Sequence, residues 1–413
     1  MRRDVSRSVG PVSDATGHVP GSRAYRRLLI ALFFAGIATF AQLYSPQAVL
    51  PLISADLGVS PPTASLAVSA TTLGLAAAVI PWSIVADRLG RVPAMTIGIC
   101  AATLLGLLAP LSGDIGVFLA IRLAEGAALG AIPAIALAYL SEEVDPRHTA
   151  SAAGSYIAGT TVGGLSGRLV SGPVADLVEW RTGLWAVAIL CAASAVVFLW
   201  LVPRARGFVA YRHRPERRLG ERLAVVLRTP AQLAIDAQGF LLMGAFVAVF
   251  NYLGFHLAEP PFSLPGWLAT LLFLSYLAGT VSSPLAGALA VRHGRLPVLL
   301  GGIAAMLVGL GALLTPSTAV VLIGLLVFTA GFFAAHAVAS GWAPVAASAD
   351  TRAQASSLYY LAYYGGSSLF GWCLGFVYAG TGWMAFVAAL AAMCTAAGVI
   401  ASAVLRSAGR APR

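Results

Sequence analysis

Apolar runs of membrane-spanning length recur along the whole 413-residue chain. Roughly 20 apolar residues in a helix cross the hydrocarbon layer of a bilayer, which is about 30 Å thick, so each run predicts a transmembrane helix. The runs lie at residues 28–50, 64–86, 94–111, 115–140, 151–174, 183–202, 233–257, 267–289, 296–314, 319–342, 355–377 and 383–405. We therefore predict an all-α integral membrane protein with twelve transmembrane helices.

The composition agrees with a membrane location and gives no sign of redox or metal chemistry. Hydrophobic residues make up 59% of the chain and charged residues 10%, with a mean hydropathy of +0.85. The first 26 residues are polar and no small-residue cleavage site follows the first apolar run, so we expect no removable signal peptide. The cysteines lie inside apolar runs without CxxC or metal-ligand spacing, which indicates buried thiols: Cys100, Cys191, Cys373 and Cys394.

Arginine predicts the orientation, because short loops rich in basic residues stay in the cytoplasm. All 26 basic residues are arginine. With the N-terminus inside, 23 of them lie on the cytoplasmic side, Arg181 lies outside, and Arg122 and Arg168 lie within helices. The expected location is the plasma membrane, the inner membrane of a bacterium, with both termini in the cytoplasm.

The chain divides into two halves that share an internal repeat. The eight residues that start at Ala86 and the eight that start at Ala290 are identical at five positions, at an offset of 204 residues. Duplicated halves are common in carrier folds. The expected organisation is a tail at 1–27, a six-helix bundle at 28–202, a basic solvated linker at 203–231, a second six-helix bundle at 232–405 and a tail at 406–413.

The repeated loop resembles a loop that is characteristic of a known protein family. The sequence Asp87-Arg88-x-Gly90-Arg91 resembles the signature loop of the major facilitator superfamily, although Ser83 replaces the glycine that opens the motif. The second copy keeps Arg292, Gly294 and Arg295 but has Val291 in place of the acid. The resemblance implies the major facilitator fold, in which two pseudo-symmetric bundles move a small molecule by alternating access.

The resemblance also implies a conformational latch at this loop. The fourth helix ends in the acidic residues Glu142, Glu143 and Asp145 on the same side of the membrane. Arg88 and Arg91 are expected to bridge to these acids when the cytoplasmic side is closed, with Asp87 near the positive N-terminal end of the eleventh helix. The alternative is a plain positively charged loop.

Two charges inside the fourth helix are candidates for proton coupling. Arg122-Leu123-Ala124-Glu125-Gly126 resembles the arginine-and-glycine pattern of that helix in the superfamily, with Glu125 where glutamine is common. Arg122 and Glu125 are three residues apart and share a helical face, and charges at this depth are costly unless paired or facing water. Glu125 either carries a proton or forms a static ion pair. His336 either shares the proton or bonds to a backbone carbonyl.

The fifth helix is rich in glycine, which resembles the motif of the antiporter branch, although its Gly172-Pro173 pair is displaced outward. The spacing of Gly159, Gly163 and Gly167 predicts close helix packing. With Gly371 and Gly375 in the eleventh helix, we expect that packing to be against the other half. Arg168 is expected to snorkel or to pair with an acid.

Further segments resemble the YnfM-like, acriflavine-sensitivity branch of the superfamily. They are Tyr139-Leu140-Ser141-Glu142-Glu143, Gly163-Gly164-x-Ser166-Gly167-Arg168, Gly239-Phe240-Leu241-Leu242-Met243-Gly244, Phe250-Asn251-Tyr252, Gly331-Phe332-Phe333-Ala334-Ala335-His336 and Gln354-Ala355-Ser356-Ser357-Leu358-Tyr359. The fold implies a central cavity lined by the first, fourth, seventh and tenth helices. The candidate cavity residues, which packing also explains, are Gln42, Tyr44, Asn251, Tyr252, Phe332, Tyr360 and Tyr363.

These observations predict proton-coupled efflux of small hydrophobic or amphiphilic compounds, a function linked to drug resistance. The chain has no GxxxxGK[ST] loop, which leaves an ion gradient as the energy source and no cofactor. The substrate charge stays open, because aromatic rings suit a lipophilic cation and Arg122 suits an organic anion. An uptake symporter or uniporter for a metabolite is the alternative, whereas the catalytic motifs of a membrane enzyme are missing. The expected partners are a small-molecule substrate and the bilayer, with no nucleic acid, and the expected state is a monomer.

The two halves differ in their candidate residues. Asp87, Arg122 and Glu125 lie in the first half, which predicts that proton coupling and the latch depend on it. Substrate choice is expected to depend more on the second half.

Overall fold

The first half of the computed structural model is built of helices joined by short connections in its described part. The structure describes residues 17–205, 219–348 and 351–408. All six predicted segments of this half are helical. The elements are α1 (Arg23–Tyr44), the 3₁₀ helix η1 (Ser45–Val49), α2 (Leu50–Asp56), α3 (Pro61–Leu89), α4 (Arg91–Leu108), the 3₁₀ turn η2 (Ala109–Leu111), α5 (Ile115–Leu129), α6 (Ala131–Glu143), α7 (Thr149–Leu177) and α8 (Trp180–Leu201).

The second half repeats this plan. Its elements are α9 (Leu219–Leu227), α10 (Pro230–Ala258), α11 (Gly266–Thr270), the 3₁₀ helix η3 (Leu271–Tyr276), α12 (Leu277–His293), α13 (Arg295–Ala312), α14 (Thr318–Ala346), α15 (Arg352–Thr381) and α16 (Trp383–Ala408). The helix α9 falls inside the predicted linker at 203–231 and was not anticipated. The remainder of that linker at 206–218, most of the predicted tail at 1–27, and residues 409–413 lie outside the described residues.

Three predicted spans are broken rather than continuous. The first breaks at Tyr44, where η1 begins, and Pro46 lies in this 3₁₀ turn without an N–H to continue the helical hydrogen bonds. The fourth breaks at Gly130 between α5 and α6, and the eighth passes through η3. Breaks of this kind persist in membranes where neighbouring protein groups satisfy the freed backbone.

The chain is a multi-pass membrane protein. Ten of the described helical stretches are long and apolar enough to cross a bilayer. The other two predicted spans, α7 and α15, are helices of 29 and 30 residues that are rich in glycine, serine and tyrosine. Each packs along other helices of the protein, α7 on α1 and α15 on α10 and α3, so neighbouring helices cover much of their polar surface.

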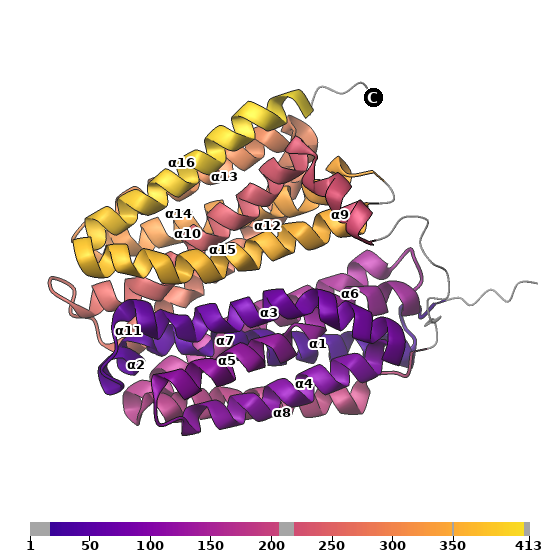
Figure 1. Cartoon of the computed structure of the whole chain (residues 1–413), viewed down its shortest axis with the longest axis horizontal. Helices are drawn as coiled ribbons and strands as arrows, with labels where there is room; N and C mark the ends of the chain where they lie inside the picture. The colour runs from indigo at the N-terminus through magenta and orange to yellow at the C-terminus, as the bar shows by residue number, and fades with distance from the viewer. Residues whose placement is uncertain (1–16, 206–218, 349–350, 409–413) are drawn as a thin grey trace, which may run out of the picture.

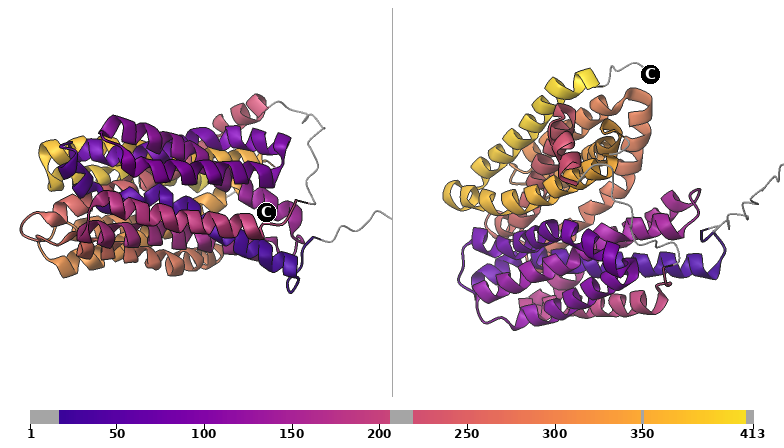
Figure 2. Two further views of the ribbon diagram at one scale, coloured as in Figure 1. Left: turned by 90° about the horizontal axis from the view of Figure 1, so that it is seen from below. Right: turned by 45° about the vertical axis from the view of Figure 1, so that its right-hand side comes forward.

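The two halves lie side by side and diverge toward the end that carries the C-terminus (Figure 1). Figure 2 shows the same divergence in its right-hand view. We call this end the arginine-rich end, because Arg91, Arg295, Arg352 and Arg406 lie there, and we call the other the opposite end. Contacts between the halves involve α3 with α15, α7 with α11 and η3, and α10 with η1.

Among the described residues, one of the two hydrophobic core clusters joins the two halves. One cluster of buried residues includes Val49 and Val68 of the first half together with Phe246 and Leu257 of the second. A separate cluster fills the arginine-rich end of the first half and contains no residue of the second half among the described residues. The halves are therefore packed together at one end of the bundle.

Candidate functional site

Arg122 and Glu125 form a buried ion pair inside the first half. Both side chains lie on α5, three residues apart, and are at most 2% exposed. The Arg122 Nε donates to the Ala67 carbonyl oxygen of α3 at 3.1 Å, and Nη2 donates to the Gln42 and Leu43 carbonyl oxygens of α1 at 3.2 and 3.0 Å. Arg122 thus connects α5 to α3 and to the end of α1.

The break in α1 explains why an arginine lies here. The last carbonyl groups of a helix have no partner within that helix, and a cation near them is favoured by the helix dipole. Arg122 donates to two of these carbonyls just before Tyr44, where α1 ends. Glu125 supplies the counter-charge, which a buried guanidinium requires.

The second carboxylate oxygen of Glu125, Oε1, takes no part in the ion pair with Arg122, which uses Oε2. Oε1 lies near the side-chain amide of Gln42, above Gly106 of α4. The Gln42 amide donates to the Ala102 carbonyl oxygen at 2.8 Å. Gln42 and Glu125 therefore point into the interior of the first half, and the placement of Gln42 at the central cavity was wrong because its side chain turns toward α4.

Arg168 of α7 is the second buried arginine, and its environment differs. Its Nε donates to Gln47 Oε1 at 2.7 Å, Nη1 to the Gly164 carbonyl oxygen at 2.6 Å, and Nη2 to the Tyr276 hydroxyl of the second half at 3.0 Å. The guanidinium also lies 4.3 Å from the ring centroid of Tyr44. The expectation that Arg168 snorkels or pairs with an acid was wrong: within the described residues its hydrogen-bond partners are neutral.

An aromatic cluster of the second half surrounds His336. The His336 Nδ1 lies 2.9 Å from the Tyr359 hydroxyl, so the partner is a tyrosine and not the backbone carbonyl considered from the sequence. The rings of Phe332 and Tyr363 lie 5.8 and 4.8 Å from the His336 ring. Tyr360 is 43% exposed, and Tyr363 and His336 are half-buried.

Asn251 and Tyr252 of α10 join the halves in this conformation. Asn251 Oδ1 accepts a hydrogen bond from Gln47 Nε2 at 2.6 Å, and its amide donates to the Gly371 carbonyl oxygen at 3.1 Å. The Tyr252 hydroxyl bonds to Ser65 Oγ at 2.8 Å. Both side chains are buried, at 1% and 0% exposure, so they are part of the closed end of the bundle and do not line an open cavity here.

The signature loop and its copy have the same backbone geometry. Gly90 and Gly294 have φ angles of +96° and +89°, a region that glycine adopts without strain, and each is followed by the arginine that begins the next helix. Arg91 contacts Asp87 at 2.6 Å and Glu142 at 2.8 Å. Arg88, Arg292 and Arg295 are exposed.

The acids at the end of α6 also bond within the first half. Glu143 lies 3.8 Å from His18, and Asp145 bonds to Arg147. Three hydrogen bonds from Arg147, two from its side chain and one from its backbone N–H, lower the pKa of Asp145 to about 2. The pairs described for the proposed latch therefore connect parts of one half.

The glycines of α7 pack against α1. A Cβ atom on Gly159, Gly163 or Gly167 would lie within 2.8 Å of the α1 backbone, so the prediction that these glycines face the other half was wrong. A Cβ on Gly375 would meet Pro62 of the first half at 3.0 Å, and one on Gly371 would meet Ser69 at 3.2 Å. These two α15 glycines lie at the contact between the halves, and so does Gly172 of α7, where a Cβ would meet Thr270 Oγ1 of α11 at 2.0 Å.

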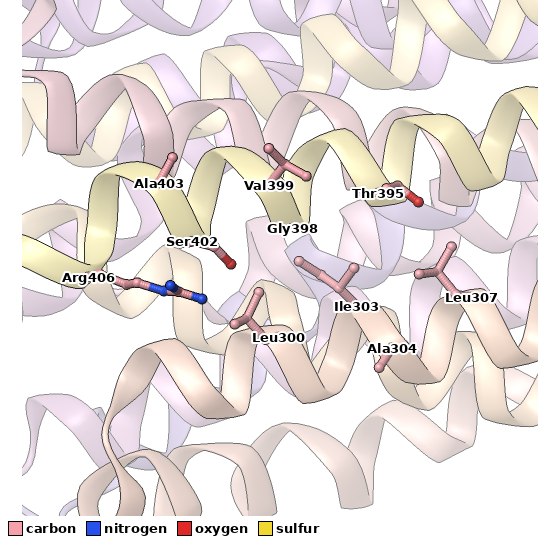
Figure 3. A pocket seen from close by; sticks show the side chains of 10 residues that line it. All are labelled: Leu300, Ile303, Ala304, Leu307, Thr395, Gly398, Val399, Ser402, Ala403 and Arg406. Carbon is pink, nitrogen blue, oxygen red and sulfur yellow. The ribbon is translucent and has the colours of Figure 1, made fainter.

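An apolar groove lies on the outside of the second half, away from these side chains. Leu300, Ile303 and Leu307 of α13 face Val399 of α16 across it, and Arg406 closes one end (Figure 3). A further hollow at the arginine-rich end lies under the α12–α13 loop and reaches Trp342. Neither hollow lies between the two halves.

Sequence reasoning missed Gln47, Phe273 and Tyr276, which surround Arg168 together with Tyr44. No motif marks them, since they come from η1 and η3, where irregular turns replace the expected helix. An arginine inside an apolar helix was the one available signal, because such a charge requires partners.

The paired helical bundles define a membrane transporter, and the comparisons agree. Residues 28–264 match the Major Facilitator Superfamily, and the chain belongs to this family. It is 38% identical over 373 residues to the inner membrane transport protein YnfM of Escherichia coli strain K12, covering 90% of this chain and 89% of that protein. It is 35% identical over 367 residues to the uncharacterized MFS-type transporter YybF of Bacillus subtilis strain 168, covering 89% and 90%.

A solved structure shows the same fold at low sequence identity. The bacterial homologue of the human lysosomal transporter Spinster, in an inward-facing and occupied conformation, superimposes with a TM-score of 0.75 at 17% identity, over 95% of this chain and 100% of that chain. The protein is therefore a secondary transporter of the superfamily and not an enzyme, and members of this family carry no cofactor.

Proposed function

We propose that this chain is a proton-coupled exporter of small amphiphilic compounds with twelve transmembrane helices. The observation that carries the proposal is the partly exposed aromatic cluster of His336, Tyr360 and Tyr363 beside the zone where the halves meet. Aromatic faces with a few polar groups bind molecules that are partly apolar. The two halves contact each other at one end of the bundle and diverge at the other. Alternating access requires conformations of this kind, which are closed on one side of the membrane and open on the other.

The arginine-rich end would face the cytoplasm. Basic residues in short loops favour that side of the membrane, and the inner leaflet is anionic. All hydrogen bonds between the halves in the described residues lie toward the opposite end, at Gln47, Ser65, Ser69 and Arg168. The conformation is then the one that an exporter uses to accept its substrate from the cytoplasm.

Glu125 and His336 remain the proposed proton carriers. The Oε1 atom of Glu125 lies near the Gln42 side-chain amide and outside the ion pair, which uses Oε2, so Oε1 would be the oxygen that takes the proton. Protonation would break the ion pair and weaken the hold of Arg122 on the end of α1. A change of charge at Glu125 would in this way alter the contacts among α1, α3 and α5.

Transport by everted vesicles with an imposed pH gradient tests this proposal. We expect dye accumulation that an uncoupler abolishes, that Glu125→Gln abolishes, and that the control Glu259→Gln preserves, because Glu259 is an exposed loop residue. Accumulation that persists with the uncoupler would overturn proton coupling. Accumulation that persists in Glu125→Gln would remove that residue from the mechanism, and His336→Gln would then be the deciding variant.

Uptake of a metabolite by symport or uniport is the second candidate. Arg168 fits this candidate as well as it fits export, because a buried cation between the halves suits the charged groups that many metabolites carry. Growth of an expressing strain against a panel of dyes and antibiotics separates the two functions. A raised tolerance supports export, whereas no change for any compound supports uptake.

A further inference from the structure

Arg168 is a buried charge without a counter-charge. Its side chain is 1% exposed, and among the described residues its hydrogen-bond partners are an amide, a backbone carbonyl and a hydroxyl. Burying an ion without a partner of opposite charge is strongly unfavourable. Arg122, the other arginine of the membrane interior, has Glu125 for this purpose.

The guanidinium also keeps hydrogen-bonding capacity. An arginine has five N–H donors in a planar fork, and three hydrogen bonds are present at Arg168. The rings of Tyr44, Phe273 and Tyr276 lie 4.3, 4.9 and 4.5 Å from its central carbon. Aromatic faces attract a cation without neutralising it, so an anion would still find a favourable partner here.

An aromatic wall leads from Arg168 to the partly exposed cluster. The Tyr276 and Phe333 rings are 5.8 Å apart, and the Phe332 ring lies 5.3 Å from Phe333 and 5.8 Å from His336. Phe333 and His336 are half-buried. The wall belongs to the second half and the arginine to the first, so a molecule bound to both would touch both halves.

We propose that Arg168 binds the anionic group of the transported molecule, a carboxylate or a sulfonate. The apolar or aromatic body of that molecule lies along Tyr276, Phe333 and Phe332. Arginine suits this role because its fork matches two oxygens of an anion. The inference rests on the proposed transport function and names its substrate class, an organic anion with an apolar body.

Anion binding would also act on the closed end of the bundle. The Arg168–Tyr276 bond is one of the hydrogen bonds between the halves. An anion that takes up the Nη2 donor competes with Tyr276 for it. Substrate binding would thereby weaken the closure of the opposite end, which is the step that release on that side requires.

Equilibrium binding to the purified full chain in lipid nanodiscs tests the proposal. The probes share one ring system and differ in charge: 2-naphthalenesulfonate, 2-naphthalenemethanol and 2-naphthyltrimethylammonium. We expect the wild type to bind the sulfonate about tenfold more tightly than the alcohol, as a charge-assisted pair allows. Arg168→Gln should lose this preference and keep alcohol binding, and Arg181→Gln, a surface control paired with Asp56, should keep the preference.

Two results would overturn the proposal. One is a wild type that binds the sulfonate no more tightly than the alcohol or the cation, and the other is a sulfonate preference that persists in Arg168→Gln. If Arg168→Gln binds none of the three probes, Arg168→Lys is the deciding variant. A sulfonate preference that falls severalfold in Arg168→Lys, with unchanged alcohol binding, supports the site. An unchanged sulfonate preference in that variant rejects it. The binding experiment contains no pH gradient, so it is independent of the vesicle transport experiment. Sulfonate selectivity in nanodiscs together with no gradient-driven transport in vesicles would support this site and reject the proposed proton coupling.

Discussion

The Gln47 side-chain amide of the first half donates a hydrogen bond to the Asn251 side-chain oxygen of the second half, with 2.6 Å between nitrogen and oxygen. Gln47 also accepts from Arg168, which bonds to Tyr276, so one polar network crosses between the halves twice. Gln47, Asn251 and Arg168 are buried and Tyr276 is half-buried, and buried networks are strong only while every member is satisfied. Alternating access requires this network to open.

Asn251→Leu should therefore favour opening of the opposite end. Of the two hydrogen bonds that the substitution removes, the one with Gln47 joins the halves and the one to Gly371 lies within the second half. Loss of one buried hydrogen bond between the halves is worth about 1 kcal/mol, which is roughly a fivefold shift in population. The readout is the reaction of Ser69→Cys, in a chain without its four native cysteines, with an impermeant maleimide added at the opposite face, because Ser69 is 1% exposed between α3 and α15. Labelling should accelerate about fivefold.

The matched control is Thr381→Val, since the Thr381 hydroxyl bonds only to its own helix at Val377. Its labelling rate should equal that of the parent chain. An unchanged rate in Asn251→Leu would show that the bond to Gln47 does not hold the opposite end closed.

The Arg91–Glu142 pair should stabilise the first half. Arg91 Nε lies 3.1 Å from Glu142 Oε1 and Nη2 lies 2.8 Å from the same oxygen. A double-mutant cycle of Arg91→Gln and Glu142→Gln should give a coupling of about 0.5–1 kcal/mol in the free energy of unfolding, as for other partly exposed pairs. The same cycle with Arg88→Gln should give a coupling near zero, because Arg88 is exposed. Equal couplings for both arginines would contradict this assignment.

Local sequence signals predicted the helices and the repeated loop. Apolar length located the helical segments other than α9, and the requirement for positive φ explains why Gly90 and Gly294 recur at the same place in the two halves. The direction in which Gln42 and Glu125 point could not be predicted. Periodicity shows which residues share a face, but the neighbour of that face depends on tertiary packing.

The surroundings of Arg168 were beyond prediction for a related reason. Gln47 is 121 residues before it and Tyr276 is 108 residues after it, and both lie in 3₁₀ turns where the apolar pattern predicted helix. The sequence showed that Arg168 lies in an apolar helix. It could not show that the neighbours of Arg168 are neutral, because those neighbours depend on how the helices pack. The same limit applies to α7, whose glycines predicted close packing but not which helix they contact.

Asp145 should give the loop before α7 a pH-dependent contribution to stability. Its pKa is lowered to about 2 by the side-chain and backbone hydrogen bonds from Arg147, whereas an unfolded aspartate has a pKa of about 3.9. The unfolded state therefore binds the proton first as the pH falls, and the stabilisation present above about pH 4 is lost toward pH 2.

The measurement is the difference in melting temperature between wild type and Asp145→Asn, because other acid-induced changes cancel in that difference. This difference in melting temperature should fall toward zero as the pH drops from about 4 through the folded pKa of about 2. The effect should be small because Arg147 is 81% exposed and water screens the pair. A difference that does not change with pH would mean that Asp145 is not held ionised by Arg147.

Two glycines on α7 should respond in opposite ways to the same substitution. A Cβ atom on Gly159 would lie 2.1 Å from the Phe33 carbonyl oxygen of α1, whereas a Cβ atom on Gly154 would have no atom within 4 Å. The obstacle at Gly159 is backbone, so α1 and α7 must move apart. Gly159→Ala should therefore destabilise the protein by about 1–3 kcal/mol, the usual cost of overpacking.

Gly154→Ala is the control, and it should be neutral or stabilise the helix by up to about 1 kcal/mol, since alanine has the higher helix propensity. Thermal unfolding of both variants in the same detergent gives the comparison. Equal melting temperatures would mean that the α1–α7 contact can accommodate a methyl group at position 159. Glycine at that position would then not be required for the close approach of the two helices. A lower melting temperature for Gly159→Ala alone would show that the packing partner of α7 is α1, within its own half.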